Sequence, residues 1–283
     1  MKGDFTVAVS LIEILKVIFL GIVEGITEWL PISSTGHMLL VDEFIKMNVS
    51  PEFKEMFFVV IQLGAILAVV MLFWNKMWPF QIKDKEQPVL KMDIFTMWIK
   101  VVLACVPGAV VTLLFDDYIE AHLHTPTVIA IALIFYGIAF IVIENWNKKR
   151  TPKVETLADI TYTTAFWIGM FQVLSIIPGT SRSGATIIGA LLIGVSRVAA
   201  AEFTFFLAVP VMLGLSLIKV IKFGLAFSAS ELVILIVGVV VAFAVSVLVI
   251  KFLMSYIKKH DFKVFGVYRI VLGLIVLIYF AVA

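Results

Sequence analysis

Residues 31–37 read Pro-Ile-Ser-Ser-Thr-Gly-His, and residues 178–184 read Pro-Gly-Thr-Ser-Arg-Ser-Gly. Each run interrupts a long apolar region, about 9–46 for the first and about 160–196 for the second. Irregular backbone is not exposed to the hydrocarbon of a membrane, because its N–H and C=O groups find no partners there. We therefore expect each run to be buried in protein, at the tip of a helical hairpin that enters and leaves the membrane on the same side.

The rest of the chain is typical of a membrane protein. Of 283 residues, 62% are hydrophobic and 15% are charged, whereas a soluble domain is about half apolar and about a quarter charged. A spanning helix needs about 20 mostly apolar residues. The predicted fold is all-α and polytopic, a single membrane domain with two re-entrant helical hairpins. About six spanning helices are predicted, at roughly 55–74, 95–115, 126–146, 201–220, 231–252 and 266–283.

Two classes of site are excluded by composition. The net charge of +2 says nothing about nucleic acid, but the sequence has no basic stripe with interleaved aromatic residues, so we expect no nucleic-acid partner. Cys105 is the only cysteine, which rules out intramolecular disulfides and clusters of thiolate metal ligands.

The two broken regions align with each other at an offset of 148 residues. Each copy holds one hairpin and three spans, an odd number of crossings. The second copy, about 147–283, is therefore expected to lie inverted relative to the first, about 1–146. The matched pairs are Gly21 with Gly169, Glu24 with Gln172, Thr27 with Ser175, Ser33 with Ser181, Thr35 with Ser183, and Gly36 with Gly184.

The charges of the loops favour this inversion. Basic loops face the cytoplasm, and they occupy different positions in the two copies. We expect both termini to lie outside. The predicted cytoplasmic residues are Lys76, Lys83, Lys85 and Lys91 in the first copy, Lys148, Lys149, Arg150 and Lys153 in the connection, and Lys258, Lys259 and Lys263 in the second copy; the acidic residues Asp116, Asp117 and Glu120 are predicted outside.

Two carboxylates precede the first break. Glu24 and Glu28 are four residues apart, on one face of a helix with apolar neighbours. A charged side chain at the bilayer centre costs roughly 2.5–3.5 kcal/mol. The pattern leaves open contact with lipid headgroups, metal ligation, proton handling and the bracing of a histidine.

Three hydroxyls and an imidazole follow Pro31. Ser33, Ser34 and Thr35 come first, and His37 lies one turn after Ser34. Helix capping explains one hydroxyl but not three beside a histidine in an apolar setting. A hydroxyl near an imidazole is the smallest arrangement for nucleophilic attack on phosphorus, with the imidazole as base. Because residues three apart share a helix face, we predict that His37 is catalytic.

The second break is suited to an anion. Gly179 allows close approach to the backbone, and the helix after it offers unpaired N–H groups and a positive dipole end. Arg182 adds a planar fork that matches phosphate oxygens. Thr180, Ser181 and Ser183 supply further donors.

The sequence leaves two roles open for Arg182. It can bind phosphate, or it can neutralise Glu24 or Glu28 across the interface between the copies, and the two roles are compatible. Either way, carboxylates, hydroxyls, an imidazole and an arginine would meet near mid-membrane. Such a constellation suits phosphoryl transfer, whose transition state needs positioned donors.

Residues 24–37, Glu-Gly-Ile-Thr-Glu-Trp-Leu-Pro-Ile-Ser-Ser-Thr-Gly-His, resemble the first signature of the undecaprenyl-diphosphate phosphatase family, the bacitracin-resistance proteins. Residues 178–184 resemble its second signature. Length, motif spacing and apolar profile are similar to the family over the whole chain. The resemblance implies a multi-pass enzyme of the bacterial cytoplasmic (inner) membrane that hydrolyses undecaprenyl diphosphate to undecaprenyl phosphate and inorganic phosphate. It would recycle the carrier lipid for cell-wall synthesis and confer bacitracin resistance.

The resemblance also implies roles for residues. Ser34 would be the nucleophile, His37 its base or acid partner, and Arg182 a phosphate ligand. Glu24 and Glu28 would support a divalent cation, Mg²⁺ or Ca²⁺, or orient the histidine; whether protein or substrate holds the ion stays open. The expected partners are a polyprenyl diphosphate lipid and the bilayer, and a homo-oligomer is compatible with the sequence. The expected substrate-binding residues are Ser33, Thr35, Gly179, Thr180, Ser181 and Ser183.

Two other functions compete with this hypothesis. Inverted repeats with broken helices at the midplane are typical of transporters, so a polyprenyl-phosphate transporter or flippase is the main alternative. A carrier needs charges and dipoles but no nucleophile beside a base. Intramembrane proteolysis by serine and histidine is the weaker alternative, because it would not need Arg182.

Overall fold

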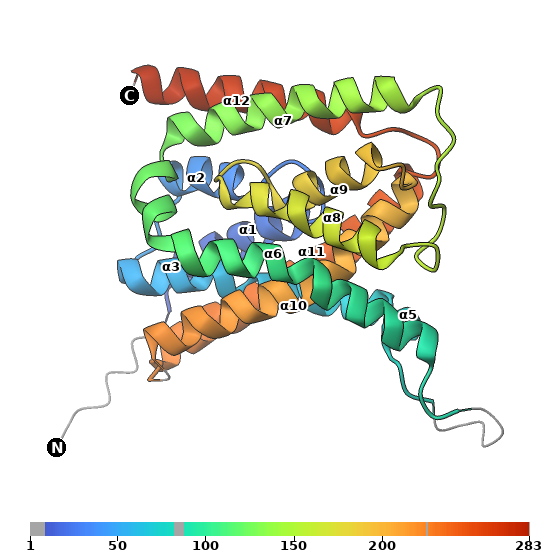
Figure 1. Cartoon of the computed structure of the whole chain (residues 1–283). Coiled ribbons are helices and arrows are strands. Elements are labelled where there is room, and N and C mark those ends of the chain that lie inside the picture. The colour runs from blue at the N-terminus through green and yellow to red at the C-terminus, as the bar shows by residue number, and fades with distance from the viewer. Residues whose placement is uncertain (1–8, 82–87, 225, 283) are drawn as a thin grey trace.

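The computed structural model describes residues 9–81, 88–224 and 226–282. Within these ranges the chain is helical, and its β pairing is limited to two isolated bridges. The all-α prediction is confirmed (Figure 1). The helices are α1 (Leu11–Thr27), α2 (Ser34–Phe44), α3 (Pro51–Val60), α4 (Gln62–Leu72), α5 (Trp74–Met77), α6 (Met92–Leu123), α7 (Pro126–Asn147), α8 (Tyr162–Val173), α9 (Arg182–Leu192), α10 (Arg197–Phe223), α11 (Ala229–Tyr256) and α12 (Lys263–Val282), with a short 3-10 turn at Leu174–Ile176.

Hydroxyl side chains determine where most of these helices begin. Each accepts a hydrogen bond from a backbone N–H in the first turn, one of the donors that have no partner within the helix. Pro51 and Pro126 occupy the first turn of α3 and α7, where a missing N–H does no harm. The capping residues are Ser10, Ser33, Ser50, Thr125, Thr161, Ser181, Ser196 and Ser228.

Six segments of the described chain are long and apolar enough to cross a membrane, as predicted. One of them, Pro51–Leu72, is α3 and α4 joined end to end at Ile61. The others are Met92–Phe115, Pro126–Asn147, Arg197–Phe223, Ala229–Tyr256 and Lys263–Val282.

The prediction of an acidic loop after residue 115 is wrong, because α6 continues as a helix to Leu123. Asp116, Asp117 and Glu120 therefore belong to the helix and not to a loop. The predicted cytoplasmic residues Lys83 and Lys85 lie outside the described residues.

The connections gather at two opposite ends of the molecule. The links from α2 to α3 and from α6 to α7 lie at one end, together with the C-terminus; the links from α7 to α8 and from α11 to α12 lie at the other (Figure 1). We call the latter the basic end, because the described lysines and arginine of residues 148–153 and 258–263 gather there.

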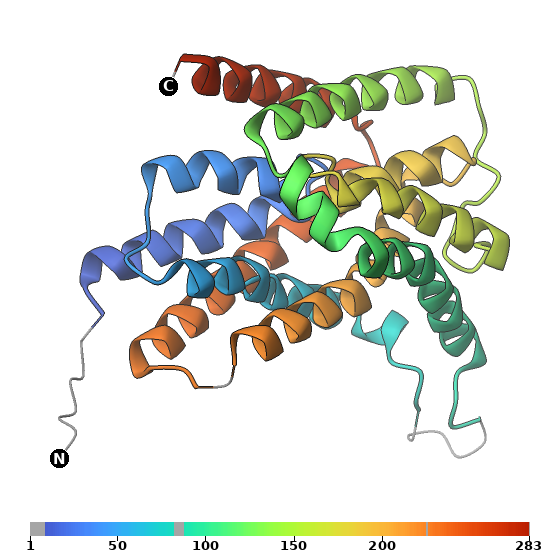
Figure 2. The same ribbon diagram turned by 60° about the vertical axis from the view of Figure 1, so that its left-hand side comes forward.

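The two interrupted regions each form a pair of short helices. Helices α1 and α2 lie side by side (Figure 2), and α8 and α9 pack against each other in the same way. The first pair extends toward the end opposite the basic end, and the second pair extends toward the basic end (Figure 1). This arrangement agrees with two re-entrant hairpins that open to opposite faces, which stays a prediction.

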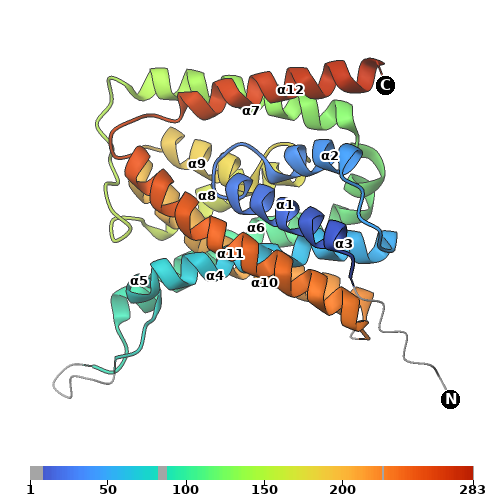
Figure 3. The same cartoon turned by 180° about the vertical axis from the view of Figure 1, so that it is seen from behind.

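Packing between the halves is reciprocal. Helix α1 packs on α11 (Figure 3), and α8 packs on α6. Glycines allow both contacts: a Cβ on Gly25 would lie 2.9 Å from the carbonyl oxygen of Ala242, and one on Gly169 would lie 2.3 Å from that of Ala104. Small residues let helices approach closely in membranes. The first helix of each hairpin thus packs against the opposite half, which supports the predicted inverted repeat.

Candidate active site

The two breaks have the same backbone turn. Ser33 has φ +74° and Ser181 has φ +71°, and they are the two non-glycine residues with positive φ in the described chain. Each hydroxyl caps the helix that follows, Ser33 accepting from the N–H of Gly36 at 3.3 Å and Ser181 from that of Gly184 at 3.2 Å. A non-glycine residue in this region costs about 1–3 kcal/mol. Both breaks therefore hold a strained cap, which their surroundings must enforce.

The carboxylate of Glu28 joins the breaks. Its Oε2 accepts a hydrogen bond from the Ser34 hydroxyl at 3.0 Å, and its Oε1 accepts one from Nη2 of Arg182 at 3.0 Å. The backbone carbonyl of Glu28 also accepts from the Ser183 hydroxyl at 3.3 Å. Glu28 and Arg182 are both largely buried. The structure thus confirms one of the two roles predicted for Arg182, neutralisation of Glu28 across the interface.

The guanidinium of Arg182 is oriented from a second side. Its Nη1 donates to the carbonyl oxygen of Thr204 in α10 at 3.1 Å. The hydroxyl of Thr204 in turn donates to that of Thr186 at 2.9 Å, in the same helix as Arg182. The arginine is therefore held between Glu28 and α10, and its Nε has no partner among the described residues.

Glu24 lies one turn before Glu28 and is buried, with 1% of its surface exposed. The two carboxylates are close enough to interact electrostatically. Oε1 of Glu24 has no hydrogen-bond partner in the described chain. A buried carboxylate oxygen without a partner is costly, so this atom is a candidate contact for a proton, a water molecule or a cation.

His37 does not contact Ser34 in the way that we expected. Its Nδ1 lies 2.7 Å from the carbonyl oxygen of Ser33, and its Nε2 lies 2.7 Å from the hydroxyl of Tyr268. Because a carbonyl only accepts, Nδ1 carries the proton in the neutral ring and Nε2 accepts from Tyr268. The Tyr268 ring also stacks on the imidazole at 5.5 Å between centroids. The hydroxyl of Ser34 is paired with Glu28 instead, because the turn before it folds that carboxylate back over the start of α2.

Arg269 is a site residue that our sequence analysis missed. It lies in α12, is fully buried, and donates from Nη1 to the carbonyl of Pro31 at 3.2 Å. Its Nη2 donates to the carbonyls of Gly179 and Thr180, each at 2.8 Å. One guanidinium thus binds the irregular backbone of both breaks. The signal in the sequence was a charge inside an apolar span, which marks a functional or bridging residue.

The remaining predicted residues occupy different positions. Ser33 and Ser181 serve as caps, and the Ser181 hydroxyl lies 3.1 Å from that of Ser183. Thr35 is exposed. Gly179 has φ +90°, and a Cβ there would lie 2.5 Å from the carbonyl oxygen of Ile129. This glycine is therefore required by its contact with α7, and its predicted role in admitting a ligand stays a prediction.

A metal site can be tested on the donors present. Within the described ranges, no group of three or more His, Cys, Asp or Glu side chains could hold an ion. Glu24 and Glu28 are two neighbouring carboxylates, one with a free oxygen. Mg²⁺ is commonly bound by one or two carboxylates together with substrate phosphates and water. The residues fit an ion that protein and substrate share.

Comparison with known proteins identifies the family of the chain. The model of the family described as bacitracin resistance protein BacA matches residues 17–275. The chain is 74% identical over 275 residues to an undecaprenyl-diphosphatase of Enterococcus faecalis, covering 97% of this chain and 100% of that protein. It is 64% identical over 272 residues to an undecaprenyl-diphosphatase of Lachnoclostridium phytofermentans, covering 96% and 98%. The chain belongs to the BacA family.

Family membership confirms the resemblance seen in the two signatures. The matched range begins before Glu24 and ends after Arg269, so every residue of the network described above lies in the part that the BacA family shares. The chain also spans nearly the whole length of both relatives. It is a multi-pass membrane protein of that family.

Proposed function

We propose that the protein hydrolyses undecaprenyl diphosphate to undecaprenyl phosphate and inorganic phosphate. The observation that carries the proposal is the Glu28 carboxylate, held between the hydroxyl of Ser34 and the guanidinium of Arg182. It brings a nucleophile, a base and a phosphate ligand to one point between the two breaks. The names of the relatives, undecaprenyl-diphosphatases over nearly the full chain, support the same substrate.

In the first step Glu28 takes the proton of Ser34. The Ser34 oxygen attacks the terminal phosphorus, and the bond from that phosphorus to the bridging oxygen breaks. The electron pair leaves with undecaprenyl phosphate. Positioned general bases contribute about 10²–10⁴-fold to such steps. Protonation cancels the charge of Glu28, so Arg182 is released to bind the oxygens of the transferred phosphoryl group.

The second step hydrolyses the phosphoserine. A water molecule attacks phosphorus, the bond to the Ser34 oxygen breaks, and inorganic phosphate leaves. We assign His37 to accept the proton of this water on Nε2, which carries the lone pair of the neutral ring. For this step the Tyr268 hydroxyl must release its hydrogen bond to Nε2. Glu28 returns its proton to the Ser34 oxygen, and His37 gives the proton that it took from water to the departing phosphate or to solvent. Both transfers together restore the starting state.

A divalent cation, Mg²⁺ or Ca²⁺, would be held by Glu24, Glu28 and the diphosphate. Its chemistry there is charge neutralisation of the two phosphates. Glu24 would direct its free oxygen to the ion, and Glu28 would retain its contact with Ser34.

We place the activity in the bacterial cytoplasmic membrane, with the basic end toward the cytoplasm. The first hairpin then opens to the outer face, where a spent carrier lipid would be released by polymer synthesis. Hydrolysis there would recycle the carrier for the cell wall. It would also confer bacitracin resistance, by removing the diphosphate that bacitracin sequesters.

The specific observation that favours a transporter is the pair of hairpins extending to opposite ends of the molecule. A carrier, however, gains nothing from a hydroxyl fixed on a carboxylate. Hydrolysis therefore accounts for more of the site than transport does.

The test is phosphate release from a polyprenyl diphosphate by purified protein in detergent with divalent cation. Wild type is compared with Glu28→Gln and with the control Glu202→Gln, which changes a carboxylate that is paired with Lys76 and that the catalytic proposal does not use. We expect release by wild type and the control and a loss of about 10³-fold in Glu28→Gln. No release by wild type, with lipid binding intact and movement of the lipid across vesicles, would establish the transporter instead.

A further inference from the structure

A cavity of about 610 Å³ lies at the basic end, away from Glu28 and Ser34. It is formed where α7 ends, α9 ends and α10 begins, with the connection 148–153 as one wall. Its charged lining residues are Glu144, Lys148, Arg150, Lys153 and Arg197. The catalytic proposal uses none of them.

The single carboxylate in this lining is already satisfied. Glu144 is fully buried and accepts two hydrogen bonds from Nε of Arg197, at 2.9 and 3.1 Å, and one from Nη2 at 2.5 Å. Its Oε1 also accepts from the backbone N–H of Phe262 at 3.0 Å. The charges of Glu144 and Arg197 therefore cancel, and the pair forms part of the cavity lining.

The other three cations have no carboxylate partner among the described ion pairs. Lys148, Arg150 and Lys153 are all exposed, and none of them is in a described salt bridge, whereas Lys16, Lys54, Lys76, Lys219 and Lys263 are. The side chain of Lys148 approaches that of Lys263, a second cation. The N-terminus of α10 adds its positive dipole end at the same wall. The cavity thus carries an excess of positive charge that is suited to an anion.

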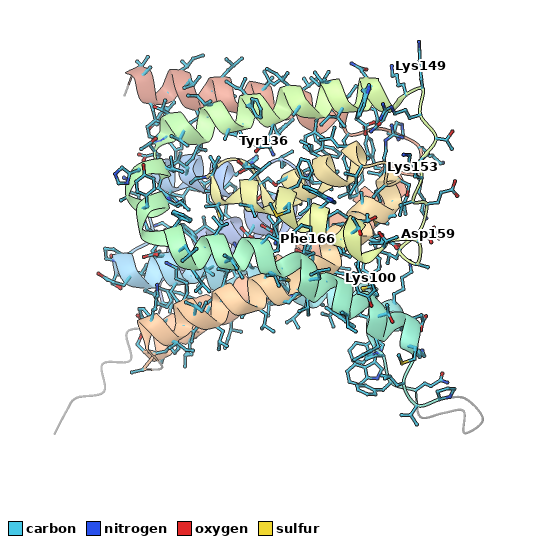
Figure 4. The ribbon with its side chains drawn as sticks, viewed as in Figure 1. Lys100, Tyr136, Lys149, Lys153, Asp159 and Phe166 are labelled. Atoms are coloured by element: carbon cyan, nitrogen blue, oxygen red, sulfur yellow. The ribbon has the colours of Figure 1, made fainter. Side chains whose placement is uncertain are left out.

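The level of the cavity in the membrane, near the lipid headgroups, indicates a lipid ligand. Trp146 lies at the end of α7, is 47% exposed, and stacks on the Arg150 guanidinium at 3.4 Å from its ring centroid. Exposed tryptophan at the end of a spanning helix marks the level of the headgroups. Lys149 and Lys153 project from the same connection at this end (Figure 4). Basic pockets between helices on the cytoplasmic side are suited to phosphate headgroups.

We propose that this cavity binds a phosphate group, that of an anionic phospholipid in the inner leaflet. Lys148, Arg150 and Lys153 hold the phosphate, and Trp146 lies against the acyl chain where it leaves the headgroup. The lipid neutralises the charges that the 148–153 connection brings together, and it stabilises the packing of this connection against α7, α9 and α10.

The test is lipid retention measured by native mass spectrometry on protein taken from vesicles of phosphatidylcholine with or without phosphatidylglycerol. The cavity variant combines Lys148→Gln, Arg150→Gln and Lys153→Gln. The control variant combines Lys149→Gln, Lys258→Gln and Lys259→Gln, which removes the same charge from exposed residues at the same end that do not line the cavity. Phosphate release in detergent verifies that both variants are folded.

We expect wild type and control to retain phosphatidylglycerol in preference to phosphatidylcholine. In the cavity variant we expect the ratio of retained phosphatidylglycerol to phosphatidylcholine to fall about tenfold or more. Equal retention by the cavity variant would overturn the proposal, as would equal losses in both variants, which would show a general effect of surface charge. A parallel melt with inorganic phosphate in detergent separates the two sources of phosphate. Stabilisation of wild type and control, but not of the cavity variant, by inorganic phosphate, with no preference of any of them for phosphatidylglycerol, would assign the cavity to a soluble anion and overturn the lipid.

Discussion

The first break and the second break begin their second helices in the same way and then differ in chemistry. Ser33 and Ser181 are equivalent at the offset of 148, and both cap a helix from a positive φ. The next residues are Ser34 in one copy and Arg182 in the other. Both side chains reach one carboxylate, that of Glu28.

The same comparison shows where the symmetry ends. The counterpart of Glu28 is Ile176, and that of His37 is Ala185. The second copy therefore lacks a carboxylate and an imidazole at these positions. A repeated backbone supplies two similar helix starts, and substitutions on one side turn them into a single asymmetric site.

The largest effect is expected from removing the carboxylate of Glu28, which has no counterpart in the second copy. Glu28→Gln is expected to lower kcat about 10³-fold, because an amide cannot accept the Ser34 proton. Glu202→Gln serves as the control. Phosphate release under saturating lipid measures both. A loss in Glu28→Gln of less than about tenfold would show that the proton goes elsewhere.

The next effect concerns the arginine that replaces the serine in the second break. Arg182→Lys keeps the charge but loses the planar fork, so kcat/KM is expected to fall about 10²-fold. The matched change Arg197→Lys alters an arginine that is paired with Glu144 and that the catalytic proposal does not use. We expect that control to affect the melting temperature more than the rate. Equal kinetic losses in the two variants would contradict a phosphate-binding role for Arg182.

A smaller effect distinguishes Glu24 from its counterpart Gln172. Glu24→Gln is expected to weaken apparent affinity for the divalent cation by about 10–100-fold, since one of two carboxylate ligands is lost. Gln172→Ala is expected to leave that affinity unchanged. Metal titrations of phosphate release measure both, and an unchanged titration for Glu24→Gln would remove the carboxylate from the metal site.

The smallest effect tests whether the two caps are equivalent. Ser33→Ala and Ser181→Ala are each expected to destabilise the protein by about 1 kcal/mol, because the cap is lost and the strain remains. Glycine at either position should restore stability, since it tolerates positive φ. Thermal melts in detergent measure all four variants. Similar shifts at the two positions support equivalent turns, whereas a loss at only one would show that the turns differ in energy.

Much of the fold was predictable because membrane helices are constrained by length and hydropathy. The six spans follow from that constraint, and the two breaks follow from proline, glycine and hydroxyl residues inside apolar stretches. The end of α6 was placed too early because polar residues after Phe115 no longer look membrane-spanning, although they continue the helix. Hydropathy predicts the spanning portion of a helix and not its full length.

The site was predictable in its residues more than in its contacts. The pairing of Arg182 with a glutamate was one of two roles that we considered, and it is present. The pairing of Ser34 with Glu28 was missed because it depends on how the turn between them folds back, which local spacing does not determine. Arg269 was missed although a charge inside an apolar span marks it, because its partners are backbone carbonyls of distant segments that residue spacing does not identify.

The central claim is that both breaks act as one unit through Glu28, and a double-mutant cycle tests it most directly. The measurement is kcat/KM for phosphate release by Glu28→Gln, Arg182→Lys and the double variant. Residues that act as a unit are strongly non-additive, so we predict that the double variant is no slower than Glu28→Gln alone. Losses that multiply, making the double variant about 10²-fold slower than Glu28→Gln, would contradict the account, because the two residues would then act independently.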